Sequence, residues 1–448
     1  RTYLAFLDIS KAFDKLDRTR LFHHIHTKGI QGKAWAMVKL LYERVDNRVI
    51  FGSYESDIFR VETGLKQGCC LAPCLFNIVI SELEGMLEGT GGVSVDETHV
   101  FGLFYADDIV MFAATDEDLL AMLDIADRFA RLWCLGYNEQ KSKVMVIGKR
   151  LSNTKWPMGN KLLDETNSYK YLGVVVNRSM KDNNHVLDHI GTKATNLESY
   201  KRYTLAMHSD INRVNFGNSL WHSAALPSLN HCAGIWFDDS NASTVKLLST
   251  QYKIGKAILK IKSKPARIAT IGELGWLPIT DELDIKRVAY YMHLKALADT
   301  RLVKKIFNAL YDLYVLHTDT QFSYFKNIKK IFQSHGVDYM FSSNGQTASF
   351  KKFIMLNHPQ SLQSEIQKLP SLQLYQTVKS DATCSSYLTS KAPFKSVQLK
   401  FKLRTGVLGL GSDLARQHRD TGICNHCGQY ESPQHFVMYC RAYNAERQ

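Results

Sequence analysis

The feature that most constrains this chain is the position of three aspartates at the ends of apolar segments. Asp8 closes the apolar run that starts at Tyr3, and the pair Asp107 and Asp108 joins two further apolar segments. Apolar runs of this length are typical of buried strands, so the sequence predicts a sheet with carboxylates at its strand ends. Because burial and like charge both oppose ionisation, three such carboxylates are costly to keep charged together.

A divalent metal ion is one remedy for this gathering of charge. Hard cations such as Mg²⁺ take oxygen ligands from one or two carboxylates together with substrate phosphates. Two such ions, about 4 Å apart, can clamp the attacking and the leaving oxygen of a phosphoryl transfer. Asp8, Asp107 and Asp108 are therefore candidate ligands of two Mg²⁺ ions. Asp107 is the safer of the adjacent pair, because neighbouring strand residues point to opposite faces.

The first 180 residues alternate between strand and helix patterns. Thr115 is a candidate N-cap with Asp118 three residues on, and Gly136 is a candidate for the left-handed position after that helix. Helices are expected at Arg18–Lys28, Lys33–Arg44, Pro73–Leu87 and Thr115–Leu135. Strands are expected at Tyr3–Asp8, Val49–Gly52, Asp57–Val61, in two parts of His99–Ala114, at Lys143–Gly148 and at Lys170–Asn177. This order predicts an α+β fold with helices on one face of an antiparallel sheet.

The positive charge lies in the later part of the chain. The 448 residues carry a net charge of +13, but residues 1–180 hold 22 basic and 23 acidic residues against 34 and 20 in residues 181–448. A polyanionic partner is expected for that later part, the alternative being a basic, soluble surface. Its pattern is mainly helical to about Val315, and His317–Gly345 and Thr377–Pro393 are candidate linkers or mobile loops.

Composition and cysteine usage exclude several classes of protein. A hydrophobic content of 45% excludes a disordered chain. The longest apolar run, Gly68–Ile80, is shorter than the roughly 18 residues that span a bilayer, so no membrane partner is expected. The nine cysteines are odd in number, with six scattered and three near the end, which does not predict a secreted disulfide framework. A nuclear and cytoplasmic location is expected. The chain begins at Arg1 without Met, and we expect an excerpt from a longer polypeptide.

The strongest metal motif lies near the end of the sequence. Cys424-x2-Cys427-x7-His435-x4-Cys440 offers three thiolates and one imidazole, the ligand set of a closed tetrahedral Zn²⁺ site. His426 is a rival ligand, and a cluster without metal is the other alternative. A second group of histidines, His23, His24 and His26, lacks cysteines or acids at matching spacing and is expected to be an exposed helix face.

Two basic stretches are candidate contacts to nucleic acid. Lys253, Lys256 and Lys260 share one helix face at i, i+3 and i+7, with a solvated face as the alternative. The second stretch interleaves cations with two aromatic residues, which suits single-stranded nucleic acid or structured RNA. Its members are Phe394, Lys395, Lys400, Phe401, Lys402 and Arg404.

Five motifs in order within residues 1–177 resemble those of reverse transcriptases, most closely the enzymes of non-LTR retrotransposons (long interspersed elements). Tyr105-Ala106-Asp107-Asp108 resembles the active-site hairpin. The others are the segment from Asp8 to Asp14, the segment from Thr63 to Pro73 with Gln67-Gly68, Asn138 with Lys141-Ser142, and Tyr171-Leu172-Gly173, which resembles the primer grip. The cysteine motif is similar to knuckles that follow the reverse transcriptase in these elements.

The resemblance implies a role for each matching residue. Asp8, Asp107 and Asp108 would bind the metal ions, and the carbonyl of Ile9 would add a ligand. Phe13 would lie under the sugar of the incoming nucleotide and exclude a 2′-hydroxyl, the alternative being an ordinary core phenylalanine.

Further roles concern the nucleotide, the leaving group and the primer. Gln67 and Gly68 would contact the nascent base pair, and Lys141 would protonate or neutralise the departing pyrophosphate unless it is a surface lysine. Asp14 is expected to cap the next helix. The primer end would be held by Tyr171, Leu172 and Gly173.

Some positions depart from the family pattern. Cys70 and Cys74 stand where proline and an apolar residue are commoner, and Ser142 replaces threonine. The fingers that normally precede Asp8 are absent from this sequence, which puts dNTP binding by the excerpt alone in doubt.

These expectations combine into one domain order and one function. The domains are a palm at 1–180 without its fingers, a helical thumb at 181–315, a linker and RNA-binding region at 316–415, and a zinc knuckle at 416–448. The expected function is an RNA-directed DNA polymerase that extends a target DNA primer on the RNA of its own element, using dNTPs, two Mg²⁺ ions and one structural Zn²⁺. The alternative is a degenerate or domesticated copy that only binds RNA.

Overall fold

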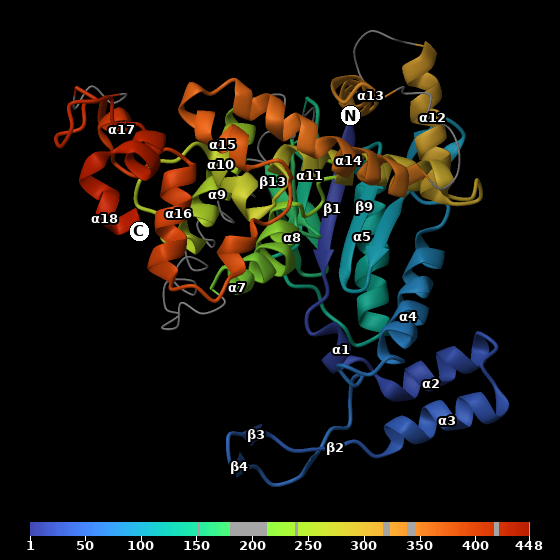
Figure 1. Ribbon diagram of the computed structural model, residues 1–448. Coiled ribbons are helices and arrows are strands. Elements are labelled where there is room, and N and C mark those ends of the chain that lie inside the picture. The colour runs from blue at the N-terminus through green and yellow to red at the C-terminus, as the bar shows by residue number, and fades with distance from the viewer. Residues whose placement is uncertain are drawn as a thin grey trace. The chain divides into compact units, whose positions relative to one another are not determined.

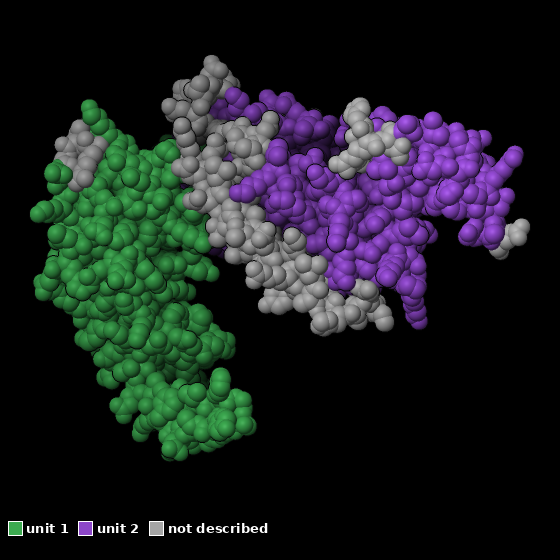
Figure 2. All heavy atoms as spheres, turned by 90° about the vertical axis from the view of Figure 1, so that its left-hand side faces the viewer, with its two compact units in different colours: residues 1–181, 308–310 green, residues 182–307, 311–448 purple. Residues whose placement is uncertain are grey.

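The computed structural model describes residues 1–149, 153–179, 213–237, 241–316, 323–337, 346–415 and 421–447. The chain divides into two compact units, Arg1–Lys181 with Asn308–Leu310, and Asp182–Phe307 with Tyr311–Gln448 (Figure 2). In these described segments, no helix combines the length and the apolar character that crossing a bilayer requires.

A six-stranded sheet forms the centre of the first unit (Figure 1). β1 (Thr2–Asp8) lies between β10 (Lys143–Ile147) and β9 (Asp108–Ala113) and pairs antiparallel with both. Because β10 runs parallel to β12 (Lys161–Glu165), the sheet is mixed, whereas an antiparallel sheet was expected. In spatial order the strands are β11 (Trp156–Met158), β12 (Lys161–Glu165), β10 (Lys143–Ile147), β1 (Thr2–Asp8), β9 (Asp108–Ala113) and β8 (Gly102–Tyr105).

Alternation along β1 builds two different faces of the sheet. Tyr3, Ala5 and Leu7 belong to the main core, into which α4 (Ala72–Leu87) and α5 (Asp116–Leu132) pack. Leu4 and Phe6 point to the other face, because successive strand residues alternate. There they pack beneath a small hairpin, β13 (Ser168–Tyr171) and β14 (Val174–Asn177). The expectation of helices on one face is confirmed, and the other face carries this hairpin.

Helices and short strands complete the first unit. The helices are α1 (Ala12–Lys15), α2 (Arg18–Thr27), α3 (Gly32–Glu43), α4 (Ala72–Leu87) and α5 (Asp116–Leu132). The short strands are β2 (Asp46–Asn47), β3 (Ile50–Phe51), β4 (Tyr54–Glu55), β5 (Phe59–Arg60), β6 (Val93–Val95) and β7 (Thr98–Val100).

Of four local expectations in this unit, one is confirmed and three need correction. Thr115 caps α5 as expected, since its Oγ1 accepts from the Asp118 N–H at 3.1 Å. The left-handed residue after this helix, however, is Cys134 with φ 54°, not Gly136. Lys170–Asn177 is part of a two-stranded hairpin, not a single strand. The N-cap of α2 is Asp17, whose Oδ1 accepts from the Arg20 N–H at 3.0 Å, and not Asp14.

The second unit is helical, as expected. Its core stacks Trp221 on Trp276, with ring centroids 4.4 Å apart, and buries Phe394 and Phe401 of α16 in the same cluster. Its first elements are α7 (Arg213–Leu220), η1 (Trp221–Ala225), α8 (Leu226–Leu229), α9 (Asn241–Ile258), α10 (Arg267–Leu274), α11 (Ile279–Ala296), α12 (Leu302–Leu316), α13 (Ser323–Ser334) and α14 (Gln346–Gln367). The rest are η2 (Pro370–Leu372), α15 (Gln373–Val378), η3 (Ser386–Thr389), α16 (Phe394–Arg404), α17 (Gly411–Ala415), η4 (His435–Tyr439), η5 (Arg441–Tyr443) and α18 (Asn444–Arg447).

The two expected linkers contain ordered structure. Within His317–Gly345, the described residues 323–337 carry helix α13, and residues 317–322 and 338–345 lie outside the described part. Within Thr377–Pro393, the side chain of Lys379 is only 2% exposed and its Nζ contacts Asp381. The described part of each segment therefore has defined structure, and in the second one a buried polar group, Lys379, finds partners.

Candidate active site and metal cluster

Asp8 and Asp108 lie directly opposite each other on neighbouring strands. The β1–β9 register pairs these two residues, so their side chains leave the same face of the sheet. Both are only partly exposed. Burial raises the pKa of the Asp108 carboxyl, and the charges of Asp107 and Asp8 raise it further. Burial and neighbouring negative charge therefore both disfavour the ionised Asp108, and a cation at this site would offset both.

Asp107 occupies the two-residue loop between β8 and β9. Ala106, its partner in that loop, has φ 52°, a left-handed conformation that costs a non-glycine residue roughly 1–2 kcal/mol. The Asp107 carbonyl accepts from the N–H of Ile9 at 3.3 Å, which ties this loop to the residue after Asp8. From the sequence, Asp107 was the preferred metal ligand of the adjacent pair, whereas the strand register places Asp108 opposite Asp8. Metal binding by Asp107 and by Asp108 remains a prediction.

The motif of Asn138, Lys141 and Ser142, which precedes β10, also contacts Asp8. The Asp8 N–H donates to Ser142 Oγ at 3.2 Å, and the Asp8 carbonyl accepts from the N–H of Asn138 at 2.8 Å. Lys141 Nζ lies 3.1 Å from Asp8 Oδ1, with a side chain that is 64% exposed. The sequence matched Asn138 and Ser142 to a motif without seeing that they fix the backbone of Asp8.

The Gln67-Gly68 loop is built against the segment that follows Asp8. Gln67 Nε2 donates to Asp14 Oδ1 at 2.9 Å, and Gly68 has φ 84°. Gly64 is required by close approach, because an added Cβ would lie 2.4 Å from the Asp14 carbonyl oxygen. Phe13, nearby, stacks on Phe76 with centroids 4.8 Å apart and is partly buried. Phe13 therefore packs as a core residue, and its contact with a nucleotide remains a prediction.

Arg18 fixes the approach to this loop and was missed by the sequence analysis. Its side chain is buried, and it donates to the carbonyls of Val61 at 2.7 Å, Thr63 at 3.0 Å and Gly64 at 2.8 Å. A further bond reaches the Tyr42 carbonyl at 3.3 Å. A guanidinium can bind several carbonyls at once because its donors are rigidly spread.

The β13–β14 hairpin places tyrosines beside the carboxylates. Tyr169 stacks on Phe6 with centroids 4.2 Å apart. Burial raises the pKa of Tyr171 to about 12, with the charge of Asp108 as the next cause. Burial also raises the pKa of Tyr169, and the charges of Asp108 and Asp8 add to this shift. Leu172 and Gly173 form the turn, with φ 47° and 83°. Tyr169 was missed, although its spacing of two from Tyr171 indicates the same face of a strand.

The Cys/His cluster is the tightest ligand group in the described residues. Reactive atoms of Cys424, Cys427, His435 and Cys440 all lie within 4.8 Å of one another. Cys424 Sγ and Cys440 Sγ are 3.8 Å apart, matching the separation of about 3.8 Å that two sulfurs 2.3 Å from a tetrahedral centre would have. The three aspartates are not gathered as tightly.

The local backbone also favours metal binding at this cluster. The His426 N–H bonds to the Cys424 sulfur and is the largest cause that lowers its pKa to about 6. His426 itself packs edge-on against Tyr443, so the structure selects His435 over this rival. Gly428, with φ 71°, forms the turn after Cys427. The donor set therefore fits zinc.

The first basic stretch is only partly a helix face. α9 ends at Ile258, so Lys253 and Lys256 lie on the helix, whereas Lys260 lies beyond it with φ 50°. Lys253 is exposed, and Lys256 Nζ lies over the ring of Tyr252. The predicted i, i+3, i+7 face is therefore wrong at its last member, because the chain turns at Lys260.

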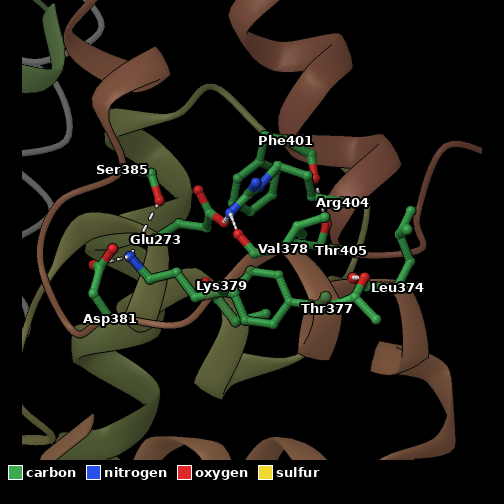
Figure 3. Close-up of polar contacts among 12 residues, drawn as sticks. Glu273, Leu374, Thr377, Val378, Lys379, Asp381, Ser385, Phe401, Arg404 and Thr405 are labelled. Carbon is green, nitrogen blue, oxygen red and sulfur yellow. Dashed lines mark hydrogen bonds and ion pairs between the residues drawn. The ribbon is translucent and has the colours of Figure 1, made fainter.

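The second basic stretch is the helix α16, and its aromatic residues are not available for stacking on bases. Phe394 and Phe401 are buried. Arg404 pairs with the fully buried Glu273, at 2.8 Å from Nη2 to Oε1, as Figure 3 shows. Its guanidinium is therefore a structural link to α10 instead of the predicted nucleic-acid contact. Lys400 Nζ lies over the ring of Tyr387.

The histidines of α2 also differ from expectation. His23 and His26 are exposed, but His24 is half-buried, with Nδ1 3.6 Å from Glu82 Oε2. Its ring meets Trp133 edge-on. His23, His24, Glu82 and Trp133 line a pocket of about 460 Å³, whereas His26 does not.

Comparison with known proteins assigns the first unit. A family model described as "Reverse transcriptase (RNA-dependent DNA polymerase)" matches residues 1–176. Residues 1–176 form a reverse transcriptase domain. Members of this family generally use divalent metal ions, a nucleic-acid template and nucleotide substrates, and the mixed sheet with its covering helices is the palm of this domain.

Three relatives come from mobile elements. A Pol polyprotein from the type-2 retrotransposable element R2DM of Drosophila melanogaster is 29% identical over 182 residues, covering 38% of this chain and 17% of that protein. The RNA-directed DNA polymerase from mobile element jockey of the same species is 26% identical, covering 41% and 20%. A Pol polyprotein from a type-1 retrotransposable element R2 of Popillia japonica is 30% identical, covering 37% and 25%. The chain thus spans a quarter or less of the length of these relatives.

A solved structure of Candida albicans telomerase with a fragment of telomeric RNA aligns with this chain at 10% identity and a TM-score of 0.30. The alignment covers 74% of this chain and 49% of the telomerase chain.

Proposed function

We propose that this chain is the RNA-directed DNA polymerase part of a non-LTR retrotransposon. It extends a DNA 3′-end at the target site by copying the RNA of its own element, and it acts in the nucleus and the cytoplasm. The observation that carries this proposal is the register that sets Asp8 opposite Asp108 within a domain matching the reverse transcriptase family. The relatives named for the retrotransposable elements R2 and jockey support the class of element.

The donor chemistry of the site fits two Mg²⁺ ions. Asp8, Asp107 and Asp108 offer carboxylate oxygens, and Ile9 offers a carbonyl. Burial first, and then the charges of Asp107 and Asp8, raise the pKa of Asp108, and a bound cation would offset both effects. When bound, the ions supply charge neutralisation at the attacking and leaving oxygens. The protein's own contribution is to position the Asp8 backbone through Asn138 and Ser142.

The other residues around the carboxylates have complementary roles in this proposal. Lys141 carries an exposed cation beside Asp8, where it would give a proton or a charge to the departing pyrophosphate. Phe13 would exclude the 2′-hydroxyl of a ribonucleotide by contact, and Gln67 and Gly68 would meet the nascent base pair.

The hairpin and the knuckle would act on the nucleic acid. Tyr171, Leu172 and Gly173 form the end of the β13–β14 hairpin, which covers the same sheet face as the carboxylates and would hold the primer end. The knuckle of Cys424, Cys427, His435 and Cys440 would bind one Zn²⁺, whose binding energy would stabilise its fold.

Primer extension tests the function. The chain, and a longer reading frame that contains it, are given an RNA template, a DNA primer, dNTPs and Mg²⁺, and product length is followed on gels. We expect extension by the longer protein and its loss in Asp107→Ala with nearly unchanged RNA affinity. Asp57→Ala, which changes an exposed aspartate, is the matched control. RNA binding without extension by the longer wild-type protein would instead identify a binding module, and activity in Asp107→Ala would refute the metal assignment.

A further inference from the structure

Asp14 has a side-chain partner that helix capping does not explain. Gln67 Nε2 donates to Asp14 Oδ1 at 2.9 Å, although the two residues are 53 positions apart in the sequence. The residue that caps the next helix is Asp17, so the carboxylate of Asp14 serves the loop of Gln67 and Gly68 instead. Asp14 and Gln67 are both exposed, so a substrate can reach the pair.

The main chain of Asp14 is held in place by a tight turn. Lys11 has φ 49°, and its carbonyl accepts from the N–H groups of Asp14 and Lys15 at 3.0 Å each. The Asp14 carbonyl in turn accepts from Thr63 Oγ1 at 3.2 Å. Because these bonds fix both the N–H and the carbonyl of Asp14, its carboxylate has a defined position from which to act on Gln67.

The segment that leads to Gln67 is anchored on the same turn. The Leu65 N–H donates to the Phe13 carbonyl at 2.5 Å, and the Leu65 side chain is buried in the main core. The main chain therefore brings Gln67 next to Asp14. The side-chain bond between them then sets the direction of the Gln67 amide.

The chemistry of the pair allows one direction of the amide. A carboxylate has only acceptors, whereas a glutamine side chain has an NH₂ donor and a carbonyl oxygen. With Nε2 held against Asp14, Oε1 is the end left for another group. A glutamine without such a bond has many rotamers, and it loses that freedom when it binds a substrate. The bond to Asp14 removes part of this freedom before the substrate arrives.

We infer that Asp14 is a positioning residue that holds the Gln67 amide in the orientation in which this side chain meets the incoming nucleotide. The inference rests on the proposed function in one respect, since that function places Gln67 at the nascent base pair. It goes further by giving a role to Asp14, which acts through Gln67 and not on the substrate. Weaker nucleotide binding with an unchanged maximum rate is the expected sign of its loss.

Single-turnover primer extension by the longer protein, at increasing dNTP concentration, separates nucleotide affinity from the maximum rate. Asp14→Ala, Gln67→Ala and the double change form a double-mutant cycle. Asp14→Asn keeps an acceptor in the same place and is the conservative variant. Glu62→Ala removes an exposed acid that precedes the same loop and is the matched control. Hydrogen exchange of the amides of residues 63–69 reports in parallel on whether the loop stays folded.

The expected result is a loss of nucleotide affinity that passes through Gln67. Asp14→Ala raises the apparent Kd for dNTP roughly tenfold, the size expected for a hydrogen bond to a charged group, and keeps the maximum rate within about twofold. Gln67→Ala raises it at least as much, and adding Asp14→Ala to that variant has no further effect. Asp14→Asn lies between the wild type and Asp14→Ala. Glu62→Ala equals the wild type, and every variant keeps the protection of the loop.

Three results would overturn the inference and leave the polymerase standing. The first is an unchanged dNTP affinity in Asp14→Ala, and the second is a pair of losses that add in the double variant. The third is a fall in maximum rate together with loop protection in Asp14→Ala, as a purely structural role would give. Absence of extension by the wild-type longer protein would instead refute the proposed function, and this role of Asp14 with it.

Discussion

Lys141 Nζ lies 3.1 Å from Oδ1 of Asp8, although 133 residues separate the two in the sequence. The contact joins the segment that begins at Asp8 to the motif of Asn138, Lys141 and Ser142. A second bond joins the same two segments, since the Ser142 hydroxyl accepts from the Asp8 N–H. Lys141 is 64% exposed and Asp8 only 14%, so the lysine is the partner that is free to move when a substrate arrives. The pair therefore joins a fixed carboxylate to a movable cation, and it gives the first prediction.

Replacing Lys141 by alanine should lower the single-turnover rate of dNTP addition by roughly 100-fold, since a positioned proton donor contributes about 10²–10⁴. The rate of Lys141→Arg should lie between those of the wild type and Lys141→Ala, because a guanidinium keeps the charge but holds its proton more firmly. Rapid-quench kinetics on the extended reading frame measure the rate. Lys28→Ala, a change at another exposed lysine, should be neutral. A wild-type rate in Lys141→Ala would remove this residue from the mechanism.

Arg18→Met should loosen the segment before the Gln67 loop. The change leaves the carbonyls of Val61, Thr63 and Gly64 without their buried donor, which should cost about 3 kcal/mol of unfolding free energy. Hydrogen exchange across residues 61–72, together with urea unfolding of the first unit, measures the loss. Arg20→Met changes an exposed arginine on the same helix and should cost under about 0.5 kcal/mol. Equal effects of the two changes would contradict the role of Arg18.

The pair of His335 and Asp284 should make part of the second unit less stable at alkaline pH. The hydrogen bond that His335 Nε2 donates to Asp284 Oδ2, at 3.2 Å, is the largest cause of the raised pKa of His335. Since the folded pKa lies above the unfolded one, the stabilisation is complete below about pH 6.5 and disappears as pH rises through the folded pKa.

Amide protection factors in α11 and α13 at pH 6 and pH 9 test this dependence. Protection should fall between these values in the wild type and stay nearly constant in His335→Gln, which lacks the titrating group. A pH-independent wild type would show that the ion pair contributes nothing.

The Cys/His cluster should hold about one zinc ion per chain. Chelation should remove it and unfold residues 421–447 while leaving the reverse transcriptase domain intact, because binding and local folding are coupled. Elemental analysis and hydrogen exchange measure the two effects. Cys424→Ser should lose the metal, and Cys134→Ser, at an exposed cysteine outside the cluster, should retain it. Protein grown with zinc that contains none would refute the knuckle.

The palm was largely predictable, because local patterns specify it. The apolar run ending at Asp8, the Thr115 cap and the helix from Pro73 all match the structure to within a residue or two. What local pattern cannot give is partners distant in sequence. Arg404 looks like any cation of a basic stretch until Glu273, 131 residues earlier, is seen buried beside it. Arg18 is another example, since its partners are carbonyls, which no side-chain pattern reveals.

The end of α9 was unpredictable for a different reason. Ile258, Leu259 and Ile261 are all buried, so hydrophobic periodicity continues past the last helical residue. The chain turns with Lys260 in a left-handed conformation, in which the N–H of Ile261 bonds back to the Lys256 carbonyl at 3.0 Å. Glycine is the usual residue at such a turn, and lysine gives no warning of it.

The central position of β1 limits how this sequence can change. The strand is hydrogen-bonded along both edges and buried on both faces, so its residues cannot shift without moving β9 and β10. Inserting or deleting a single residue between Thr2 and Leu7 while the pairing is kept would rotate Asp8 to the side of the sheet that faces α4 and α5. Diverging copies of this gene should therefore accumulate exchanges within β1 but preserve its length.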